Sequence, residues 1–184
     1  DVDISNDGTH FVVGAPSNGA GYFAVYVWND SLLPPEWDFI FFGQGIEDIE
    51  GFGSRVSMLL DNGSLLAVGA PNFGDGQGVI RIYEESASGE YTQVGSNIVG
   101  ETGDRLGTKN TFSGDGFTVI AGTANGFTKR FDFDVNADEW VQLYDPVDTD
   151  YVGGVAATDA GNTFVAAGSS GGIREATIFK FAAL

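Results

Sequence analysis

The chain lacks cysteine altogether and is poor in histidine, proline and basic residues. Its 184 residues include no Cys, one His, five Pro and eight Lys or Arg. The absence of Cys excludes disulfides, thiolate metal sites and Cys nucleophiles. It does not set the cellular compartment, because an extracellular β-protein of this size can fold without bridges. No apolar run is long enough to cross a membrane as a helix.

The scarcity of basic residues leaves a strongly acidic chain. Its 26 Asp and Glu residues against eight Lys and Arg give a formal net charge of −18. Such a charge repels phosphate, which argues against nucleic acids and anionic membranes as partners. Divalent cations, basic protein patches and neutral glycans are compatible with it.

Glycine, in contrast, is abundant, with 28 residues, and it marks a pattern that occurs four times. In each copy a turn glycine precedes an apolar segment. The pairs are Gly8 with 11–13, Gly63 with 65–68, Gly116 with 119–121 and Gly161 with 164–167. Their spacing of 45–55 residues is typical of propeller blades, which run to about 40–50 residues before insertions. The sequence therefore predicts an all-β array of radial sheets, a β-propeller.

Each copy has the features of a four-stranded antiparallel blade. The first strand alternates apolar and polar residues, and the second is apolar throughout, as expected of a strand covered on both faces. The third ends on an aromatic residue. The fourth opens with an acid–aromatic pair, at Glu36-Trp37, Glu90-Tyr91 and Glu139-Trp140. Acidic connections at 47–51, 100–104 and 147–150 are expected to lead into the next blade.

We expect one domain, 1–184, with blades at 1–51, 52–105, 106–151 and 152–184, the last without its outer strand. An open stack of four blades would leave a sheet edge and a sheet face uncovered, and closed rings have about 4–8 blades. The chain is therefore expected to be an excerpt of a larger ring, or to be completed by a neighbouring subunit.

Short motifs recur in the same order along nearly the whole chain. They are Gly14-Ala15-Pro16, Phe52-Gly53 with Gly69-Ala70-Pro71, Leu106-Gly107 with Gly122, and Val152-Gly153. In these motifs the chain resembles the FG-GAP repeat, the unit of integrin α-subunit β-propellers, and the FG-GAP-like arrays of marine bacteria and diatoms. The resemblance implies a seven-bladed ring and an extracellular or lumenal binding role.

The FG-GAP family often carries a calcium loop between the first two strands, and this chain departs from that pattern. The first copy keeps Asp3, Ser5 and Asp7 at alternate positions, but the late ligand position is apolar in every copy, at Phe11, Leu66, Val119 and Phe164. An apolar side chain cannot coordinate a cation that takes about 6–8 oxygen ligands. We interpret the segment as a hairpin turn and expect no cofactor, with calcium at Asp3, Ser5 and Asp7 as the alternative.

Catalytic signals are weak. His10 is the one histidine, and no Ser-His-Asp or His-metal set can be assembled around it from equivalent positions. The many carboxylates lie on predicted turns, where a solvated rim is a simpler interpretation than a glycosidase pair. The segment 74–78 is Gly-rich, but a strand rather than a helix follows it, so it is not predicted to bind a nucleotide.

The leading hypothesis is a non-enzymatic extracellular or lumenal module that binds a protein or glycan through its inter-strand loops. Strand parity places second-to-third loops and fourth-to-first connections at one end of the ring. The candidate binding residues are Asn18, Asn72, Phe73, Asp75, Gln77, Glu101, Asp104, Asn125 and Phe127.

Two alternatives to this hypothesis stay open, a scaffold subunit of a larger assembly and, as the minor one, a glycan-active enzyme. Trp37, Tyr91 and Trp140 recur at one blade position, where rim packing and glycan stacking are both compatible with the pattern. Two sequons, at Asn29 and Asn62, permit glycosylation of a secreted chain.

Overall fold

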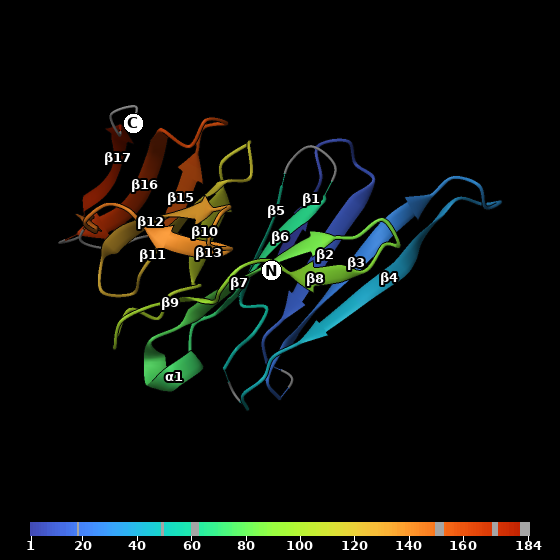
Figure 1. Ribbon diagram of the computed structural model, residues 1–184, viewed down its shortest axis with the longest axis horizontal. Coiled ribbons are helices and arrows are strands. Elements are labelled where there is room, and N and C mark those ends of the chain that lie inside the picture. Colours follow the sequence, from blue (N-terminus) through green and yellow to red (C-terminus); the bar gives the residue numbers. More distant parts are fainter. Residues whose placement is uncertain (18, 49, 60–62, 150–152, 171–172, 181–184) are drawn as a thin grey trace.

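The computed structural model describes residues 1–17, 19–48, 50–59, 63–149, 153–170 and 173–180. These residues form four antiparallel sheets that follow one another along the chain (Figure 1). The sequence-based prediction of an all-β array of antiparallel blades is thus confirmed. Among the described residues there is no helix long and apolar enough to cross a bilayer.

The four sheets, called here the first to fourth blades, keep their strands in chain order. The first blade is β1 (Val2–Ile4), β2 (His10–Ala15), β3 (Tyr22–Asn29) and β4 (Glu36–Gln44). The second is β5 (Arg55–Met58), β6 (Leu65–Ala70), β7 (Val79–Glu85) and β8 (Tyr91–Gln93), with β9 (Ile98–Val99) also on β7. The third is β10 (Lys109–Phe112), β11 (Thr118–Gly122), β12 (Phe127–Asp134) and β13 (Glu139–Gln142), with β14 (Val147–Asp148) also on β12. The fourth is β15 (Gly154–Ala157), β16 (Thr163–Ser170) and β17 (Ile173–Lys180).

The outer strand is continuous in the first blade and interrupted in the next two. Residues 94–97 separate β8 from β9, and residues 143–146 separate β13 from β14. Gly95 has a left-handed φ of 70°, and Pro146 has no N–H to give to the ladder, so neither segment continues its strand. Val147 and Asp148, expected in a connection, pair with β12 instead.

The first strands of the four blades surround a common cavity. β5 lies between β1 and β10, and β10 lies between β5 and β15. Together with the residues just after them, these strands line a cavity of about 310 Å³. Figure 1 shows the blades spreading outward from these inner strands. This is the radial arrangement that the repeat period predicts.

The second strands of the second and third blades, β6 and β11, are buried on both faces, as their continuous apolar sequence predicts. Leu66 and Val68 pack in a core with the first blade, whereas Ala67 packs in a core with the third. All three side chains have 0% exposure. Neighbouring sheets therefore cover the apolar middle of the second and third blades, and this burial is the main source of stability.

The repeated glycines form the joint between consecutive blades. A Cβ added to Gly14 would lie 2.1 Å from the backbone O of Gly53. The next joint is the same, with 2.1 Å between a Cβ on Gly69 and the backbone O of Gly107. The Phe-Gly or Leu-Gly dipeptide of one blade thus lies directly on the Gly of the second strand in the blade before it. Only residues without a side chain permit this approach.

Candidate functional site

The second-to-third loops and the fourth-to-first connections gather at one end of the blades. We call this the loop end and define it as the described residues of 45–51, 71–78, 100–107 and 123–126. Backbone hydrogen bonds join its segments: the N–H of Asn72 donates to the O of Glu50 (3.0 Å), and the N–H groups of Gly103 and Arg105 donate to the O of Gly76 (3.2 and 3.0 Å). The loop end is therefore one continuous surface across three blades.

The loop between β6 and β7 contains a short helical turn, α1 (Phe73–Gly76). It is a tight loop rather than a regular helix, because Gly74 and Asp75 have left-handed φ values of 58° and 57°. Asp tolerates this conformation better than most residues, since its short polar side chain can bond locally. The turn places the Asp75 carboxylate outward, in solvent.

A buried ion pair supports the loop end between the first two blades. Glu50 Oε1 and Oε2 accept from the two Nη atoms of Arg81 at 2.9 and 3.2 Å, and both side chains are at most 1% exposed. Glu50 Oε1 also accepts from the N–H of Ile46 at 2.8 Å. The Arg81 guanidinium lies 5.0 Å from the Phe52 ring centre and 5.5 Å from that of Phe73. Buried charges require this kind of pairing.

An equivalent pair lies one blade further on. Lys129 Nζ donates to Asp104 Oδ2 at 2.6 Å, with side chains 5% and 2% exposed. The Nδ2 of Asn125 and the N–H of Glu101 also donate to this carboxylate, at 3.0 and 2.7 Å. Burial by itself raises the pKa of Asp104, but the hydrogen bond and charge of Lys129 and the bonds from Glu101 and Asn125 outweigh it and lower the pKa.

Sequence reasoning missed both ion pairs, although a signal is present. Each acid stands two residues before the Phe-Gly or Leu-Gly dipeptide, and each base occupies the same register position in the third strand, opposite Val68 in one blade and Ala121 in the next. An acid and a base that recur together at fixed blade positions would have indicated a contact across the blade joint.

The predicted binding residues divide into exposed and structural ones. Asn72, Asp75 and Glu101 are exposed, and Asn72 Oδ1 accepts from Arg105 at 2.7 Å. Asp104, a candidate binding residue, lies at the loop end as predicted, but its side chain is buried in the ion pair with Lys129.

The other predicted residues are partly covered or engaged. Phe73 and Gln77 are half-buried, and Phe127 is half-buried at the start of β12. The Asn125 amide is exposed but donates to Asp104 and accepts from Thr123 at 2.5 Å. Asn18 lies outside the described residues. The loop end thus brings the 72–77 and 101–105 segments together and joins 123–126 to them through Asp104.

The calcium candidates lie at the opposite end of the first blade, where their oxygens bond within the turn. Asp7 Oδ1 accepts from Ser5 Oγ (2.6 Å) and from the N–H of Thr9 (2.9 Å). These bonds, that from Ser5 first, lower the pKa of Asp7 to about 2. Asp3 Oδ2 accepts from the N–H of Met58 in the second blade at 2.8 Å. In the part of the chain that the structure describes, no three His, Cys or acidic side chains are grouped to hold a metal.

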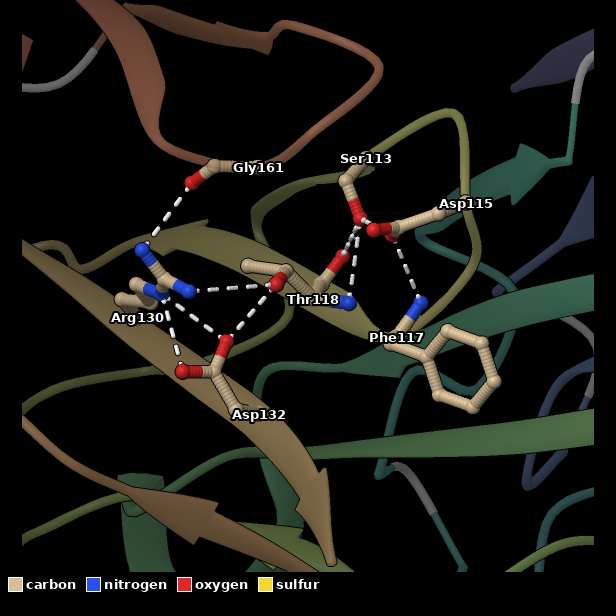
Figure 2. A network of polar contacts seen from close by, with 7 residues as sticks. All are labelled: Ser113, Asp115, Phe117, Thr118, Arg130, Asp132 and Gly161. Atoms are coloured by element: carbon tan, nitrogen blue, oxygen red, sulfur yellow. Dashed lines mark hydrogen bonds and ion pairs between the residues drawn. The ribbon is translucent and has the colours of Figure 1, made fainter. Parts of the chain in front are cut away.

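The same turn recurs in the third blade (Figure 2). Ser113 Oγ donates to Asp115 Oδ1 at 2.5 Å, and that oxygen also accepts from the N–H of Phe117 at 3.1 Å. The N–H of Thr118 donates to Ser113 Oγ at 3.0 Å. A Ser and an Asp two residues apart therefore fold the turn by satisfying its backbone groups.

Next to this turn, an arginine ties the third blade to the fourth. Arg130 Nε donates to both carboxylate oxygens of Asp132, at 2.8 and 3.0 Å, and its Nη1 donates to the O of Gly161 at 3.0 Å (Figure 2). Thr118 Oγ1 donates to the same Asp132 at 2.7 Å. The network is a structural bridge between two blades.

His10 lies at a blade joint. It starts β2, is half-buried, and its Nδ1 lies 2.8 Å from Thr9 Oγ1. Its Nε2 lies 3.9 Å from Glu85 of the second blade. Of the sequons, Asn29 Nδ2 donates to Asp38 at 2.6 Å, and Asn62 lies outside the described residues.

The recurring rim aromatics of the second and third blades pack against the blade before each of them. Tyr91 and Trp140 are 3% and 7% exposed. Tyr91 donates its hydroxyl to the O of Gly63 at 2.8 Å, and Trp140 Nε1 donates to the O of Val94 at 3.3 Å. Trp37, at the same position of the first blade, is 36% exposed. Packing thus accounts for the recurrence at Tyr91 and Trp140.

Comparison with known proteins places this fold among the β-propellers. No family model matches the chain, and no curated protein does. The β-propeller domain of Cps50 (Swd1) from Myceliophteria thermophila is similar to it, with a TM-score of 0.66 and 15% identity over 98% of this chain and 52% of that one. A functionally unknown protein from Desulfotomaculum acetoxidans is also similar, with a TM-score of 0.68 and 17% identity over 99% of this chain and 51% of that one.

A third similar structure is a putative 6-phosphogluconolactonase from Bacteroides uniformis, with a TM-score of 0.58 and 12% identity over 97% of this chain and 56% of that one. At such identities these likenesses show the fold alone. The chain spans about half the length of the structures it matches.

Proposed function

We propose that this chain is a non-enzymatic propeller module that binds a basic protein segment at its loop end. The observation that carries the proposal is the set of four exposed acidic side chains there, which are Glu47, Asp48, Asp75 and Glu101. Their negative charge adds to the field of a chain with a net charge of −18. Such a surface attracts cationic partners and speeds their association.

The exposed acids stand on connections that also contain the acids of the two buried ion pairs. Glu50, which pairs with Arg81, belongs to the same connection as Glu47, and Asp104, which pairs with Lys129, belongs to the same connection as Glu101. Backbone hydrogen bonds join the α1 turn to the 103–105 segment. A surface that is ordered before binding loses less conformational entropy when a partner docks. The loop end therefore meets a requirement of a recognition surface.

The assignment to the FG-GAP-like repeats, a seven-bladed ring and an extracellular or lumenal location are part of the same proposal. The close contact of glycines between blades supports the assignment to the FG-GAP-like repeats, because it gives the Phe-Gly and Gly-Ala-Pro motifs one shared structural role. A glycan is the alternative ligand, and a scaffold role in a larger assembly is the alternative function.

Enzymatic activity is a weaker proposal. The pKa of Asp7 and that of Asp104 are lowered, which is the opposite of what a carboxylic general acid needs near neutral pH. The likeness to a putative 6-phosphogluconolactonase and to hydrazine synthase from Kuenenia stuttgartiensis, at 12% and 14% identity, carries the fold and not the chemistry.

The test is binding of an oligolysine peptide, measured by calorimetry at low and physiological salt. Asp75→Asn combined with Glu101→Gln should weaken binding roughly two- to thirtyfold, since exposed ion pairs contribute about 0.2–1 kcal/mol each. Glu90→Gln with Glu139→Gln removes the same charge from the far hairpins and is the control. Equal weakening by both double variants would refute the loop end as the site. Binding of a neutral glycan panel, with no peptide binding, would favour the alternative ligand.

A further inference from the structure

The cavity between the first strands of the blades has polar walls and lies apart from the loop end. Its volume of about 310 Å³ falls within the range of about 300–1,000 Å³ that small-molecule sites occupy. The charged and hydroxyl-bearing side chains that line it are Asp3, Arg55, Ser57, Thr111, Ser113 and Asp159. A cavity of this size with a few polar groups is a candidate site for a small polar molecule.

Between the first two blades, an aspartate of the chain itself shows how a carboxylate fits on a first strand. The N–H of Met58 in β5 donates to Asp3 Oδ2 of β1 at 2.8 Å. The N–H of the next residue, Leu59, donates to the O of Leu65, and antiparallel ladders use alternate residues. The N–H of Met58 therefore lies on the edge of β5 that no strand pairs, and the Asp3 carboxylate satisfies it.

The equivalent N–H one blade further on is that of Phe112. Register gives Phe112 the position in β10 that Met58 has in β5. The N–H of Ser113 donates to the O of Thr118, so the same alternation directs the N–H of Phe112 to the unpaired edge of β10.

This N–H has no acceptor among the described residues. The position that Asp3 has in β1 is taken in β5 by Ser57, which has no carboxylate to offer. Phe112 is 6% exposed, and a buried N–H without an acceptor is costly. The space between β5 and β10 therefore has the donor of the Asp3 contact without its acceptor.

A cation lines the same cavity. Arg55 Nη1 lies 3.3 Å from Asp1 Oδ1, whereas Arg55 Nε is buried and has no partner among the described residues. A guanidinium N–H forms a stronger hydrogen bond with a carboxylate than with a neutral acceptor. Arg55 and the N–H of Phe112 both favour a carboxylate as the missing acceptor.

The acids of the cavity decide the net charge of the ligand. Both oxygens of Asp3 are engaged, Oδ1 by the N–H of Ile4 at 2.9 Å and Oδ2 by Met58. Asp159 differs, because no described residue donates to its carboxylate. The chain's net charge of −18 repels anions but exerts no net force on a zwitterion, whose ammonium group can pair with Asp159.

We propose that the cavity binds a small zwitterion of the α-amino acid class. Its carboxylate accepts from the N–H of Phe112, beside Ser57 and Arg55. Its ammonium group faces Asp159. The ligand thus does between β5 and β10 what Asp3 does between β1 and β5. This site goes beyond the proposed function, and neither depends on the other.

The spacing of the two ends of the site fits such a ligand. A Cβ added to Gly114 would lie 2.7 Å from Asp159 Oδ1, so Asp159 is next to Gly114. Gly114 is two residues beyond Phe112, at most about 7 Å of chain. The carboxylate and ammonium of an α-amino acid, each with a hydrogen bond of about 2.9 Å, span a length of this order.

The test is titration of the whole chain with L-alanine, followed by the NMR signals of the backbone amides. The amide of Phe112 should shift and saturate. Acetate and methylammonium each carry one of the two charges, so each should bind about tenfold more weakly or less, since a hydrogen bond to a charged group contributes about 1.5–3 kcal/mol.

Two variants test the two ends of the site separately. Ser57→Asp repeats the Asp3 contact one blade further on, so it should abolish alanine binding and slow the hydrogen exchange of the Phe112 amide. Asp159→Asn should weaken alanine binding about tenfold and leave acetate binding unweakened. Ser88→Asp adds the same charge as the first variant on an exposed hairpin and is the control. The urea midpoint of each variant verifies that it folds.

Three results would overturn the proposal. The first is an amide of Phe112 that L-alanine does not shift up to its solubility limit, which indicates that only water occupies the cavity. The second is acetate binding as tight as that of alanine, because it removes the role of Asp159. The third is a Ser57→Asp chain that still binds alanine, or that loses binding while its Phe112 amide exchanges as fast as before.

Discussion

Replacing Gly69 by Ala should destabilise the protein through the joint between the second and third blades. The new Cβ would lie 2.1 Å from the backbone O of Gly107, 2.7 Å from its C and 2.8 Å from its Cα. All three are backbone atoms, so no side chain can rotate away. The φ of Gly69 is not left-handed, so the variant tests the close approach and not the local backbone conformation.

The magnitude follows from the overlap. To relieve the overlap, the two blades must separate by roughly 1 Å at this point. Atoms in contact across the joint would then lose about a quarter to a half of their dispersion energy. Overpacking of this kind typically costs about 1–3 kcal/mol. For a chain of this length each kcal/mol lowers Tm by about 2–4 °C, so a loss of roughly 2–12 °C is expected.

The assay is thermal and urea unfolding of Gly69→Ala beside a matched control. Gly154→Ala is the control because Gly154 also stands in a strand, has no left-handed φ and has no neighbour within 4 Å of an added Cβ. That variant should be neutral or stabilised by up to about 1 kcal/mol through the unfolded chain. Equal unfolding of the two variants would refute the glycine joint.

Three further predictions concern charges. Glu50→Gln leaves Arg81 buried and uncompensated, so it should cost about 3–5 kcal/mol in urea unfolding, and a loss below about 1 kcal/mol would contradict the pairing. The pKa of Asp104 is lowered in the folded chain, so the stability that its carboxylate gains with Lys129 is fully present above the unfolded pKa and is lost as pH falls through the folded pKa. Asp104→Asn should remove this part of the loss of stability in acid, and an unchanged dependence of the unfolding free energy on pH would contradict the pairing. The pKa of Asp7 is about 2 in the folded chain against its ordinary value of 3.8, so this carboxylate should contribute stability that is lost as pH falls from about 4 to 2. The unfolding free energy of Asp7→Asn should therefore change less over that range, and a slope equal to that of the unsubstituted protein would contradict the hydrogen bonds of the turn.

The blades could be predicted from the sequence because their signals are local. Continuous apolar runs such as 65–68, each preceded by a turn glycine, fix the buried strands and their hairpins. The return of the outer strand at Val147 and Asp148 could not be predicted from the sequence. These two residues follow Pro146 in an acidic segment, which is typical of a connection between blades. Pairing with β12 overrides that local pattern.

The loop end could be predicted only as a grouping of segments. Strand parity placed the 72–77 and 101–104 segments together, and backbone bonds join them. Which side chains point inward could not be derived, because an irregular segment has no period that separates faces. Glu101 and Asp104 stand three residues apart, yet one side chain is 86% exposed and the other 2%.

The exposure of equivalent residues in the first two blades illustrates the same limit in a different way. Val2 and Val56 are both valines, and they occupy equivalent positions in the first and second blades. The sequence therefore gives no reason to expect that their exposures differ. One is 69% exposed and the other 1%. The difference comes from the arrangement of the blades, because Val56 packs in a core with residues of the first blade.

The central claim is that the second strands of the second and third blades lie covered between neighbouring sheets, and amide hydrogen exchange tests it most directly. The amides of β6 and β11 should be the slowest to exchange, opening only with the free energy of global unfolding. The exposed hairpin between β3 and β4 should exchange faster by orders of magnitude. Exchange of β6 and β11 as fast as that hairpin would contradict the account.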